Sequence, residues 1–395
     1  MELVNFARDI HFREYQEKPV VTVKANGRFH LIGEHSYFCK DKTLSMSVNL
    51  PVYVSISKRE DSSLRCYFHQ LDDRKRANIS NLKLKKEDRW ANAIKAIVYG
   101  FTSAGFSVPG LNISISSQTL PSAGFGITTA IKVALAYCIK TLLKDNCSEN
   151  QILQVIERAN KLFLEIDNHI ADNFAAIYSK ENTVILTDHA TGKYDLIPFN
   201  FEDKVILLTD AKVPRVELWN EETLRQPENV LLLGELKNRK ANVYGGWSYE
   251  ENPNEINEVL SVVNEEMRRR LLCLMQEHKC VIEAQKSLSK GEFGGFARAV
   301  NHSHEGMRDL FDLSCPEIDW ILKRLQEINP NVEDSRNPTS CGRITGKGFG
   351  RVAFTILKRE DVEAFKQKLF EFERIFGFKT STYEVMPSGG VTIVE

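Results

Sequence analysis

Three polar side chains stand close together in the segment of residues 27–35, GRFHLIGEH. Arg28, Glu34 and His35 are set among apolar residues that would by themselves suffice for a strand and its turn. An arginine, a carboxylate and an imidazole offer hydrogen-bonding and charged groups to a polar ligand. A surface turn that carries charges is the alternative, and the residues alone leave both interpretations open.

A second candidate is the turn GFGITT, residues 124–129, which leads directly into an amphipathic helix. Gly124 and Gly126 let the backbone approach a ligand, and the free N–H groups and dipole of a helix start favour an anion. Thr128 and Thr129 offer hydroxyls to a phosphate oxygen or to Mg²⁺. A turn in which the threonines cap the helix explains the segment equally well. It is not a P-loop, because no lysine follows the glycines at the required place.

A third candidate is the glycine run GRITGKGFG, residues 342–350, ahead of a predicted buried strand. Gly346 and Lys347 combine a permissive backbone with a cation, which would suit a polyphosphate. A β-hairpin or bulge with solvated charges is the alternative, and the segment alone favours it.

Asp172, in NHIADNFAAIY, is predicted at the end of a helix and before a strand. A carboxylate there could orient a hydroxyl or accept its proton as a general base. An isolated aspartate is more often a cap or turn residue, so the segment alone favours the structural interpretation.

Strands and helices of mixed order must position these candidates, which indicates an α+β or α/β first lobe. A strand from Val20 is predicted to break at Asn26-Gly27, and a helix from Asp88 to end at Gly100 or Gly105. Further strands and helices are predicted by their apolar spacing, including strands at 44–59 and 111–117, helices at 127–142 and 149–163, a helical hairpin at 255–290 and a closing strand or hairpin at 382–394.

The length of 395 residues suggests about two or three lobes, and we expect a boundary near residue 195, between lobes 1–195 and 196–395. A formal net charge of -1 leaves no basic excess for nucleic acid. The N-terminus lacks the apolar run of a signal peptide or membrane helix, and the 8 cysteines include no Cys-x-x-Cys pair. We therefore expect a cytoplasmic protein without nucleic-acid or membrane partners.

Taken in order, these segments resemble the GHMP kinase family and, within it, galactokinase. GRFHLIGEH is similar to the family's GRVNLIGEH, RWANAIK to an adenine-pocket segment and PSAGFGITTA to a phosphate loop of the PxGxGLSSSA type. ADNF resembles the MDQF stretch that holds the catalytic aspartate, SCPEID resembles SCPELD, and GRITGKGFG resembles SRMTGGGFG. The similarity covers almost the full length.

The resemblance implies a two-lobed α+β fold, with an N-terminal lobe like ribosomal protein S5 domain 2 and a ferredoxin-like C-terminal lobe. It implies a monomer that binds ATP with Mg²⁺ and a sugar, whose anomeric hydroxyl attacks the γ-phosphate. Arg28 and Asp172 would be catalytic. The other implied roles are sugar binding by Glu34 and His35, triphosphate binding by Gly124, Gly126, Thr128, Thr129, Gly346 and Lys347, and adenine binding by Trp90.

Several positions depart from the family pattern. A sugar-binding aspartate becomes Tyr37, a glycine before the catalytic aspartate becomes His169, and a sugar-contacting tyrosine aligns with Glu222. The metal ligands would be Thr128 and Asn160, the latter in place of an acidic residue, which weakens a Mg²⁺ site because Mg²⁺ prefers charged oxygen donors. These changes indicate an altered ligand.

Two functions remain open at this point. One is an ATP-dependent sugar 1-kinase acting on galactose or a related sugar, supported by the retention of Arg28, Glu34, His35 and Asp172. The other is a non-catalytic sensor derived from galactokinase that binds sugar and nucleotide, supported by Asn160. We favour the enzyme, because electrostatic and acid-base catalysis need Asp172 and Arg28 more than any one metal ligand.

Overall fold

The computed structural model describes residues 2–37, 40–121, 124–144, 147–213, 261, 264–328, 337–346 and 351–394. The chain folds into two compact units that are interleaved in the sequence. Unit 1 comprises Met1–Arg28, Ser47–Lys180 and Ser388–Glu395, and unit 2 comprises Phe29–Met46 and Glu181–Pro387. The mixture of helices and strands confirms the α+β class. The single boundary near residue 195, between lobes 1–195 and 196–395, stays a prediction.

The sheet of unit 1 joins the two ends of the chain. Its strand order is β12-β1-β2-β5-β3-β4. β3 and β5 are parallel, whereas β1–β12, β2–β5 and β3–β4 are antiparallel pairs. The strands are β1 (Val21–Ile32), β2 (Lys42–Arg59), β3 (Ser63–Phe68), β4 (Asp73–Asn78), β5 (Gly110–Ser117) and β12 (Thr392–Val394). The prediction of a closing strand is confirmed by β12, whereas the alternative of a closing hairpin is wrong, because β12 pairs with β1.

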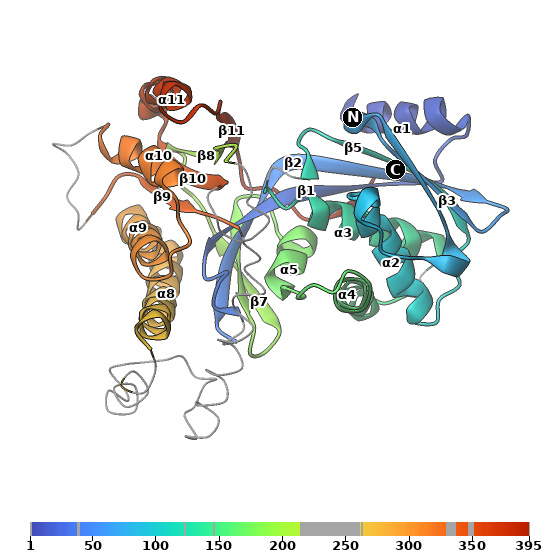
Figure 1. Cartoon of the computed structure of the whole chain (residues 1–395), viewed down its shortest axis with the longest axis horizontal. Helices are drawn as coiled ribbons and strands as arrows, with labels where there is room; N and C mark the ends of the chain where they lie inside the picture. Colours follow the sequence, from blue (N-terminus) through green and yellow to red (C-terminus); the bar gives the residue numbers. More distant parts are fainter. Residues whose placement is uncertain are drawn as a thin grey trace. The chain divides into compact units, whose positions relative to one another are not determined.

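Helices cover both faces of this sheet (Figure 1). On one face, His11 of α1 contacts the hydroxyls of Ser114 and Ser57 at 2.9 and 3.1 Å. On the other face, the thiol of Cys138 in α3 donates to Val54 O at 3.3 Å. The helices of unit 1 are α1 (Glu2–Tyr15), α2 (Ala91–Ser103), α3 (Ile127–Leu142), α4 (Glu149–Arg158) with a π-helical turn (Ala159–Phe163), and α5 (Ile170–Tyr178).

Two glycines at which breaks were predicted in unit 1, Gly27 and Gly100, lie inside their elements for the same reason. β1 continues through Asn26-Gly27, where a Cβ on Gly27 would lie 2.8 Å from Phe125 O. α2 continues through Gly100, where a Cβ would lie 2.4 Å from Val155 O. Both glycines permit close backbone packing instead of a turn. The other predicted end of the helix, at Gly105, is confirmed, because α2 ends at Ser103 and Gly105 follows with a φ of 89°.

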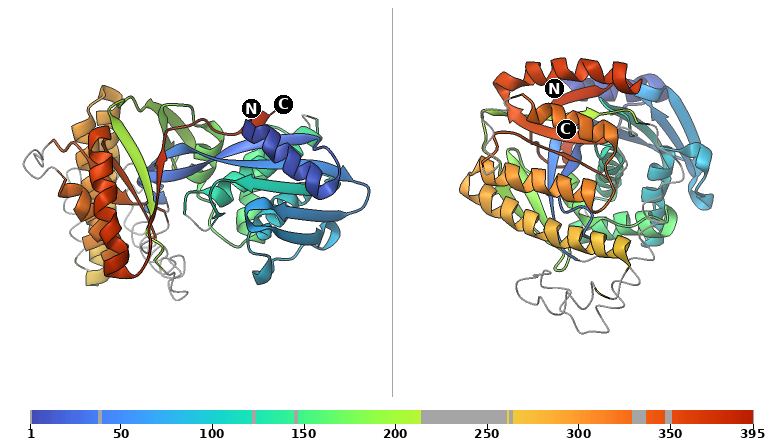
Figure 2. Two further views of the ribbon diagram at one scale, coloured as in Figure 1. Left: turned by 90° about the horizontal axis from the view of Figure 1, so that it is seen from above. Right: turned by 60° about the vertical axis from the view of Figure 1, so that its left-hand side comes forward.

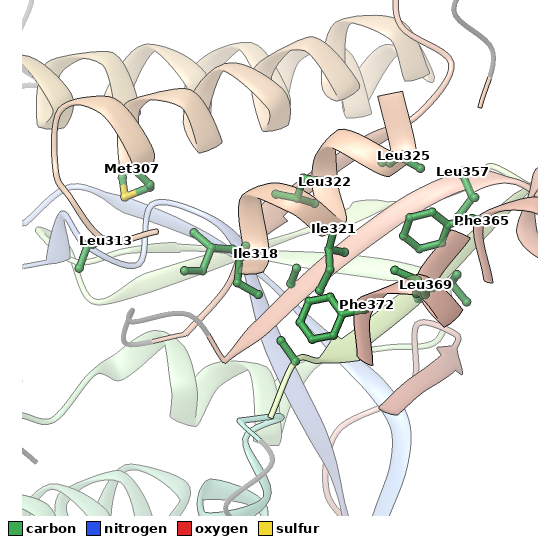
Figure 3. Close-up of a cluster of buried hydrophobic side chains, with 14 of the residues drawn as sticks. Met307, Leu313, Ile318, Ile321, Leu322, Leu325, Leu357, Phe365, Leu369 and Phe372 are labelled. Carbon is green, nitrogen blue, oxygen red and sulfur yellow. The ribbon is translucent and has the colours of Figure 1, made fainter. Parts of the chain in front are cut away.

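Unit 2 contains a four-stranded antiparallel sheet, β11-β8-β10-β9, formed by β8 (Lys204–Asp210), β9 (Cys341–Ile344), β10 (Val352–Lys358) and β11 (Ser381–Val385). The start of β2 pairs with β6 (Thr183–Asp188), which pairs with β7 (Lys193–Pro198). The core lies where α10 (Pro316–Gln326) and α11 (Val362–Phe376) pack on the four-stranded sheet. Figure 3 shows Ile321 and Phe372 from these two helices meeting there.

A long helical hairpin completes unit 2. α8 (Glu265–Lys290) and α9 (Phe293–Asp309) lie side by side, as Figure 2 shows. The hairpin predicted within residues 255–290 is therefore wrong, because residues 265–290 form one uninterrupted helix whose partner follows it. Within the described part of the chain, no helix has the length and apolar character needed to cross a membrane.

Candidate active site

The candidate residues of unit 1 include an ion pair between Arg28 and Asp172. Arg28 lies on β1 and Asp172 in the first turn of α5, and Arg28 Nη2 is 2.7 Å from Asp172 Oδ1. The side chains of Arg28 and Asp172 are 11% and 19% exposed to solvent. A carboxylate in the first turn of a helix is also favoured by the helix dipole. The prediction that Asp172 ends a helix is wrong, because the preceding helix stops at the π-helical turn and α5 begins after His169.

The glycine turn packs against Arg28. The Arg28 N–H donates to Phe125 O at 2.8 Å. Gly126 has a φ of 70°, and a Cβ there would lie 2.8 Å from Arg28 Cγ. Only glycine fits this position without strain, since φ is positive and the space is taken. The turn therefore sets the position of Arg28.

The same turn leads into α3 without a side-chain cap. The N-cap residue is Gly126, and no side chain among the described residues caps the helix. The alternative that threonines cap it is therefore wrong. Thr128 is exposed and Thr129 is buried in the first turn, while Gly124 has a φ of 84°. The start of α3 keeps backbone N–H groups that suit an anion.

Asn160 belongs to a chain of hydrogen-bonded polar side chains in unit 1. Its Oδ1 accepts from Lys132 Nζ at 2.6 Å, and its Nδ2 donates to Asn168 Oδ1 at 2.7 Å. Asn173, next to Asp172, also donates to Asn168 Oδ1, at 3.1 Å. The amide oxygen of Asn160 thus faces an ammonium group. No local pattern marks Lys132 as a buried residue, because lysine side chains are usually solvated.

Trp90 and His169 remain predictions as site residues. The Trp90 side chain is used within unit 1, where its indole N–H donates to Asp73 Oδ2 at 2.9 Å and its ring packs edge-on against Phe68. His169 stands immediately before α5, three residues from Asp172, and is half-buried.

In unit 2, Glu34 is part of a buried cluster around Arg343. Arg343 Nη1 is 2.7 Å from Glu34 Oε1, and Arg343 Nη2 is 2.9 Å from Glu277 Oε1. Arg343 Nε donates to Ser303 Oγ at 2.7 Å. Glu277 Oε1 also accepts a hydrogen bond from the backbone N–H of Gly33 at 2.7 Å, so it helps to fix the position of the turn that carries Glu34. The Arg343 side chain is completely buried.

The two carboxyl groups of this cluster differ in acidity. Burial would raise the pKa of Glu34, but Arg343, His35 and His30 together lower it to about 2. Burial raises the pKa of the Glu277 carboxyl, and Glu34 raises it further against the opposing effect of Arg343. Glu34 is therefore the ionised partner of Arg343 at neutral pH, while Glu277 holds a proton more readily.

The remaining candidates of unit 2 lie around this cluster or outside the described residues. His35 Nε2 is 3.6 Å from Glu34 Oε1, and the ring of Tyr37 lies 6.3 Å from that of His189. Gly346 has a φ of 89°, and β9 and β10 form the antiparallel pair that the hairpin interpretation requires. Glu222 and Lys347 lie outside the described residues.

The structure thus divides the predicted site residues into two sets, one in each unit. Unit 1 holds Arg28 and Asp172 in contact, with the glycine turn against Arg28. Unit 2 holds Glu34 and His35. Sequence reasoning missed Glu277, because nothing in α8 marks one glutamate of a charged helix as buried. Arg343 lies in the glycine run of residues 342–350, but sequence reasoning singled out Gly346 and Lys347 there.

Two family models match parts of the chain. The model described as "GHMP kinases N terminal domain" matches residues 91–180, and the "Galactokinase galactose-binding signature" matches residues 10–58. The first covers α2 to α5, and the second covers the strand with Arg28 and the turn with Glu34.

Relatives and solved structures agree with these matches. A Treponema pallidum (strain Nichols) protein named "Putative galactokinase" is 36% identical over 97% of this chain and 95% of its own length. The galactokinase of Thermotoga maritima is 27% identical over 93% of this chain and 99% of its own. The structure of Lactococcus lactis galactokinase complexed with galactose matches with a TM-score of 0.86 at 20% identity, covering 99% of this chain and 100% of that one. Methanococcus jannaschii mevalonate kinase matches with a TM-score of 0.64 at 13% identity, covering 93% and 98% of the two chains.

Proposed function

The chain belongs to the galactokinase family of GHMP kinases, and on this premise we propose that it transfers the γ-phosphate of ATP to the anomeric hydroxyl of galactose or a related sugar. The observation that carries the proposal is the contact between Arg28 and Asp172 at 2.7 Å. These residues are far apart in the sequence, and they meet beside a glycine turn that suits a phosphate.

In this proposal Asp172 orients the sugar hydroxyl and accepts its proton. Arg28 holds the aspartate through one guanidinium nitrogen and stabilises negative charge on the transferred phosphoryl group. Most of the rate would come from positioning and charge stabilisation, because phosphoryl transfer needs little covalent chemistry from the protein. The partial exposure of both side chains supports access to a substrate.

The glycine turn would bind the triphosphate. Gly124 and Gly126 shape the turn, and the N–H groups at the start of α3 and the hydroxyl of the exposed Thr128 would contact phosphate oxygens. Thr129 is buried and would support the turn, while Gly346 and Lys347 of unit 2 stay candidates for nucleotide binding.

The residues proposed as metal ligands do not fit Mg²⁺. Thr128 and Asn160 supply no charged oxygen, and Asn160 Oδ1 already accepts a hydrogen bond from the Lys132 ammonium at 2.6 Å. Mg²⁺ prefers carboxylate and phosphate oxygens, and a neighbouring ammonium repels it. No step of the proposed mechanism therefore passes through a metal held by Asn160.

Glu34 and His35 would bind sugar hydroxyls. The Glu34 pKa of about 2 keeps its carboxylate ionised, and a carboxylate has more acceptor sites than the bond to Arg343 uses. Tyr37, His169 and Glu222 would define how the acceptor differs from galactose.

The alternative of a non-catalytic sensor for sugar and nucleotide is favoured by one observation, the hydrogen bond from Lys132 to Asn160, the residue expected as a metal ligand.

We also propose that the protein is a cytoplasmic monomer. Use of ATP supports the compartment, as do the cysteines of the described chain, which are all free thiols.

An ADP-release assay over galactose, other hexoses, amino sugars and pentoses tests the function. We expect turnover with at least one sugar, and a loss of about 10²- to 10⁴-fold in Asp172→Asn with ATP binding preserved. Asp309→Asn is the matched control, because it breaks an exposed arginine–aspartate pair of the same 2.7 Å length. Stabilisation by ATP and a sugar without any turnover would favour the sensor. Full activity of Asp172→Asn would remove that residue from the mechanism.

A further inference from the structure

Glu277 of α8 is bonded to the turn that carries Glu34 by two separate routes. The backbone N–H of Gly33 donates directly to Glu277 Oε1 at 2.7 Å. The second route passes through Arg343, whose Nη2 donates to Glu277 Oε1 at 2.9 Å and whose Nη1 donates to Glu34 Oε1 at 2.7 Å. One buried carboxylate is thus connected to two adjacent residues of the turn.

The bonds around Arg343 have fixed directions. A guanidinium group can only donate, so Ser303 Oγ accepts from Arg343 Nε at 2.7 Å, and the Ser303 hydroxyl donates to Glu277 Oε2 at 2.5 Å. Arg343 Nη1 also donates to the backbone oxygen of Ile344 at 2.8 Å. Because the guanidinium is planar and rigid, these bonds fix the direction from which Arg343 Nη1 meets Glu34. The orientation of the Glu34 carboxylate therefore depends on Glu277, which lies on a different element.

The direct bond to Glu277 also holds the backbone of the turn. Gly33 has a φ of 92°, and a Cβ there would collide with the backbone oxygen of Lys42. The Gly33 C=O accepts from Thr43 Oγ1 at 2.9 Å and from Ser36 Oγ at 3.0 Å. The peptide groups on both sides of Gly33 are therefore held, one by these hydroxyls and the other by Glu277.

A contribution to stability is a weak reason for this cluster. Burial of charged groups costs free energy, and a buried ion cluster is often no more stable than apolar side chains of the same volume. The cluster does give Gly33 and Glu34 one defined geometry. Both residues lie in the segment 10–58 that matches the galactose-binding signature, so this geometry concerns the sugar.

We propose that Glu277 is a positioning residue for the acceptor sugar, which fixes the orientation in which the Glu34 carboxylate accepts a hydrogen bond from a sugar hydroxyl. The inference rests on the proposed function, in which Glu34 binds the sugar. Glu277 acts through Arg343 and Gly33. Loss of its carboxylate should therefore weaken sugar binding and leave ATP binding unchanged.

Steady-state kinetics of the full chain tests this inference, with the sugar that the wild type turns over fastest in the ADP-release panel. Glu277→Met keeps the length of the side chain but removes both oxygens, and should raise the KM for the sugar about 10- to 100-fold, as expected for lost hydrogen bonds to charged groups. The KM for ATP should stay within about threefold of wild type. Glu277→Gln should restore the KM for the sugar, because its amide oxygen can accept from Gly33 and Arg343 and its amide nitrogen can donate to Ser303.

The two KM values separate positioning from a purely structural role. A variant that only folds less well has a lower apparent kcat, because less enzyme is active, but its KM values are unchanged. Glu283→Met is the control, because Glu283 lies on the same helix, is 38% exposed and pairs with Arg298. This variant should change neither KM.

Ser303→Ala provides a milder test if Glu277→Met does not fold. It removes one bond from Glu277 and one from Arg343, and should raise the KM for the sugar about three- to tenfold. A KM for the sugar within twofold of wild type in whichever of these two variants folds would overturn the inference and leave the proposed function intact. A wild type that turns over no sugar of the panel would overturn both.

Discussion

Two arginine–carboxylate arrangements, one in each unit, use similar groups for different purposes. Arg28 and Asp172 in unit 1 form an ion pair whose side chains keep part of their exposure. Arg343 in unit 2 is completely buried and contacts two glutamates and a serine. The first arrangement leaves donor capacity for a ligand, whereas the second uses its guanidinium within the protein.

The difference shows why the same residue types have different energetic roles. A buried arginine must have its hydrogen bonds satisfied, because the desolvation of a charge is expensive. The Arg343 cluster therefore holds the turn with Gly33 and Glu34 in place and stabilises unit 2. The Arg28–Asp172 pair needs less compensation, so its groups can exchange partners during a reaction.

The largest expected effect is on the buried cluster. Arg343→Met leaves Glu34 and Glu277 without their cation and should lower the free energy of unfolding by about 3–5 kcal/mol. Urea unfolding of the full chain measures it. The triple variant with Glu34→Gln and Glu277→Gln should recover part of the loss, because it removes the unpaired charges. A loss below about 1 kcal/mol in Arg343→Met would contradict the structural role.

Arg28→Met, the matched change in unit 1, should lower activity strongly and stability only slightly. Arg28→Met should lower kcat by about 10²- to 10³-fold, as for loss of a charge-stabilising donor. It should lower the free energy of unfolding by only about 1–2 kcal/mol, because the pair is partly exposed. The ADP-release assay and urea unfolding of the same preparation give both values. Equal losses of stability in Arg28→Met and Arg343→Met would remove the contrast between the units.

The smallest expected effect is a change in pH dependence. Burial raises the folded-state pKa of Glu277, so its contribution to stability is present at low pH and is lost as pH rises through that pKa. The lowered pKa of Glu34 has the opposite effect: its contribution is present above the unfolded value of about 4.3 and is lost as pH falls toward 2.

Glu277→Gln removes the pH dependence of stability that comes from Glu277 and keeps the one that comes from Glu34. The stability of this variant relative to the wild type should therefore be greater at about pH 8.5 than at about pH 5. Urea unfolding midpoints at the two pH values measure the difference. A constant difference between variant and wild type would show that Glu277 titrates alike in the folded and unfolded chain.

Much of the site in unit 1 could be predicted from the sequence. The glycine turn before α3 has a local cause, since glycine alone fits the positive φ of Gly126. The family resemblance implied that Arg28 and Asp172 are both catalytic, and the structure places their side chains 2.7 Å apart. The break at Asn26-Gly27 was predicted wrongly, because turn preference acts locally and close packing against Phe125 outweighed it.

The element types, the glycine turn before α3 and the family of the chain could be predicted from the sequence alone, because these depend on apolar spacing and on motifs within a few residues of one another. The buried cluster of Arg343 and Glu277 with Glu34, and the bond between Lys132 and Asn160, could not be predicted in this way and became visible in the folded chain. These contacts join residues distant in the chain, and whether a charged side chain is solvated or buried depends on the partners that folding brings to it.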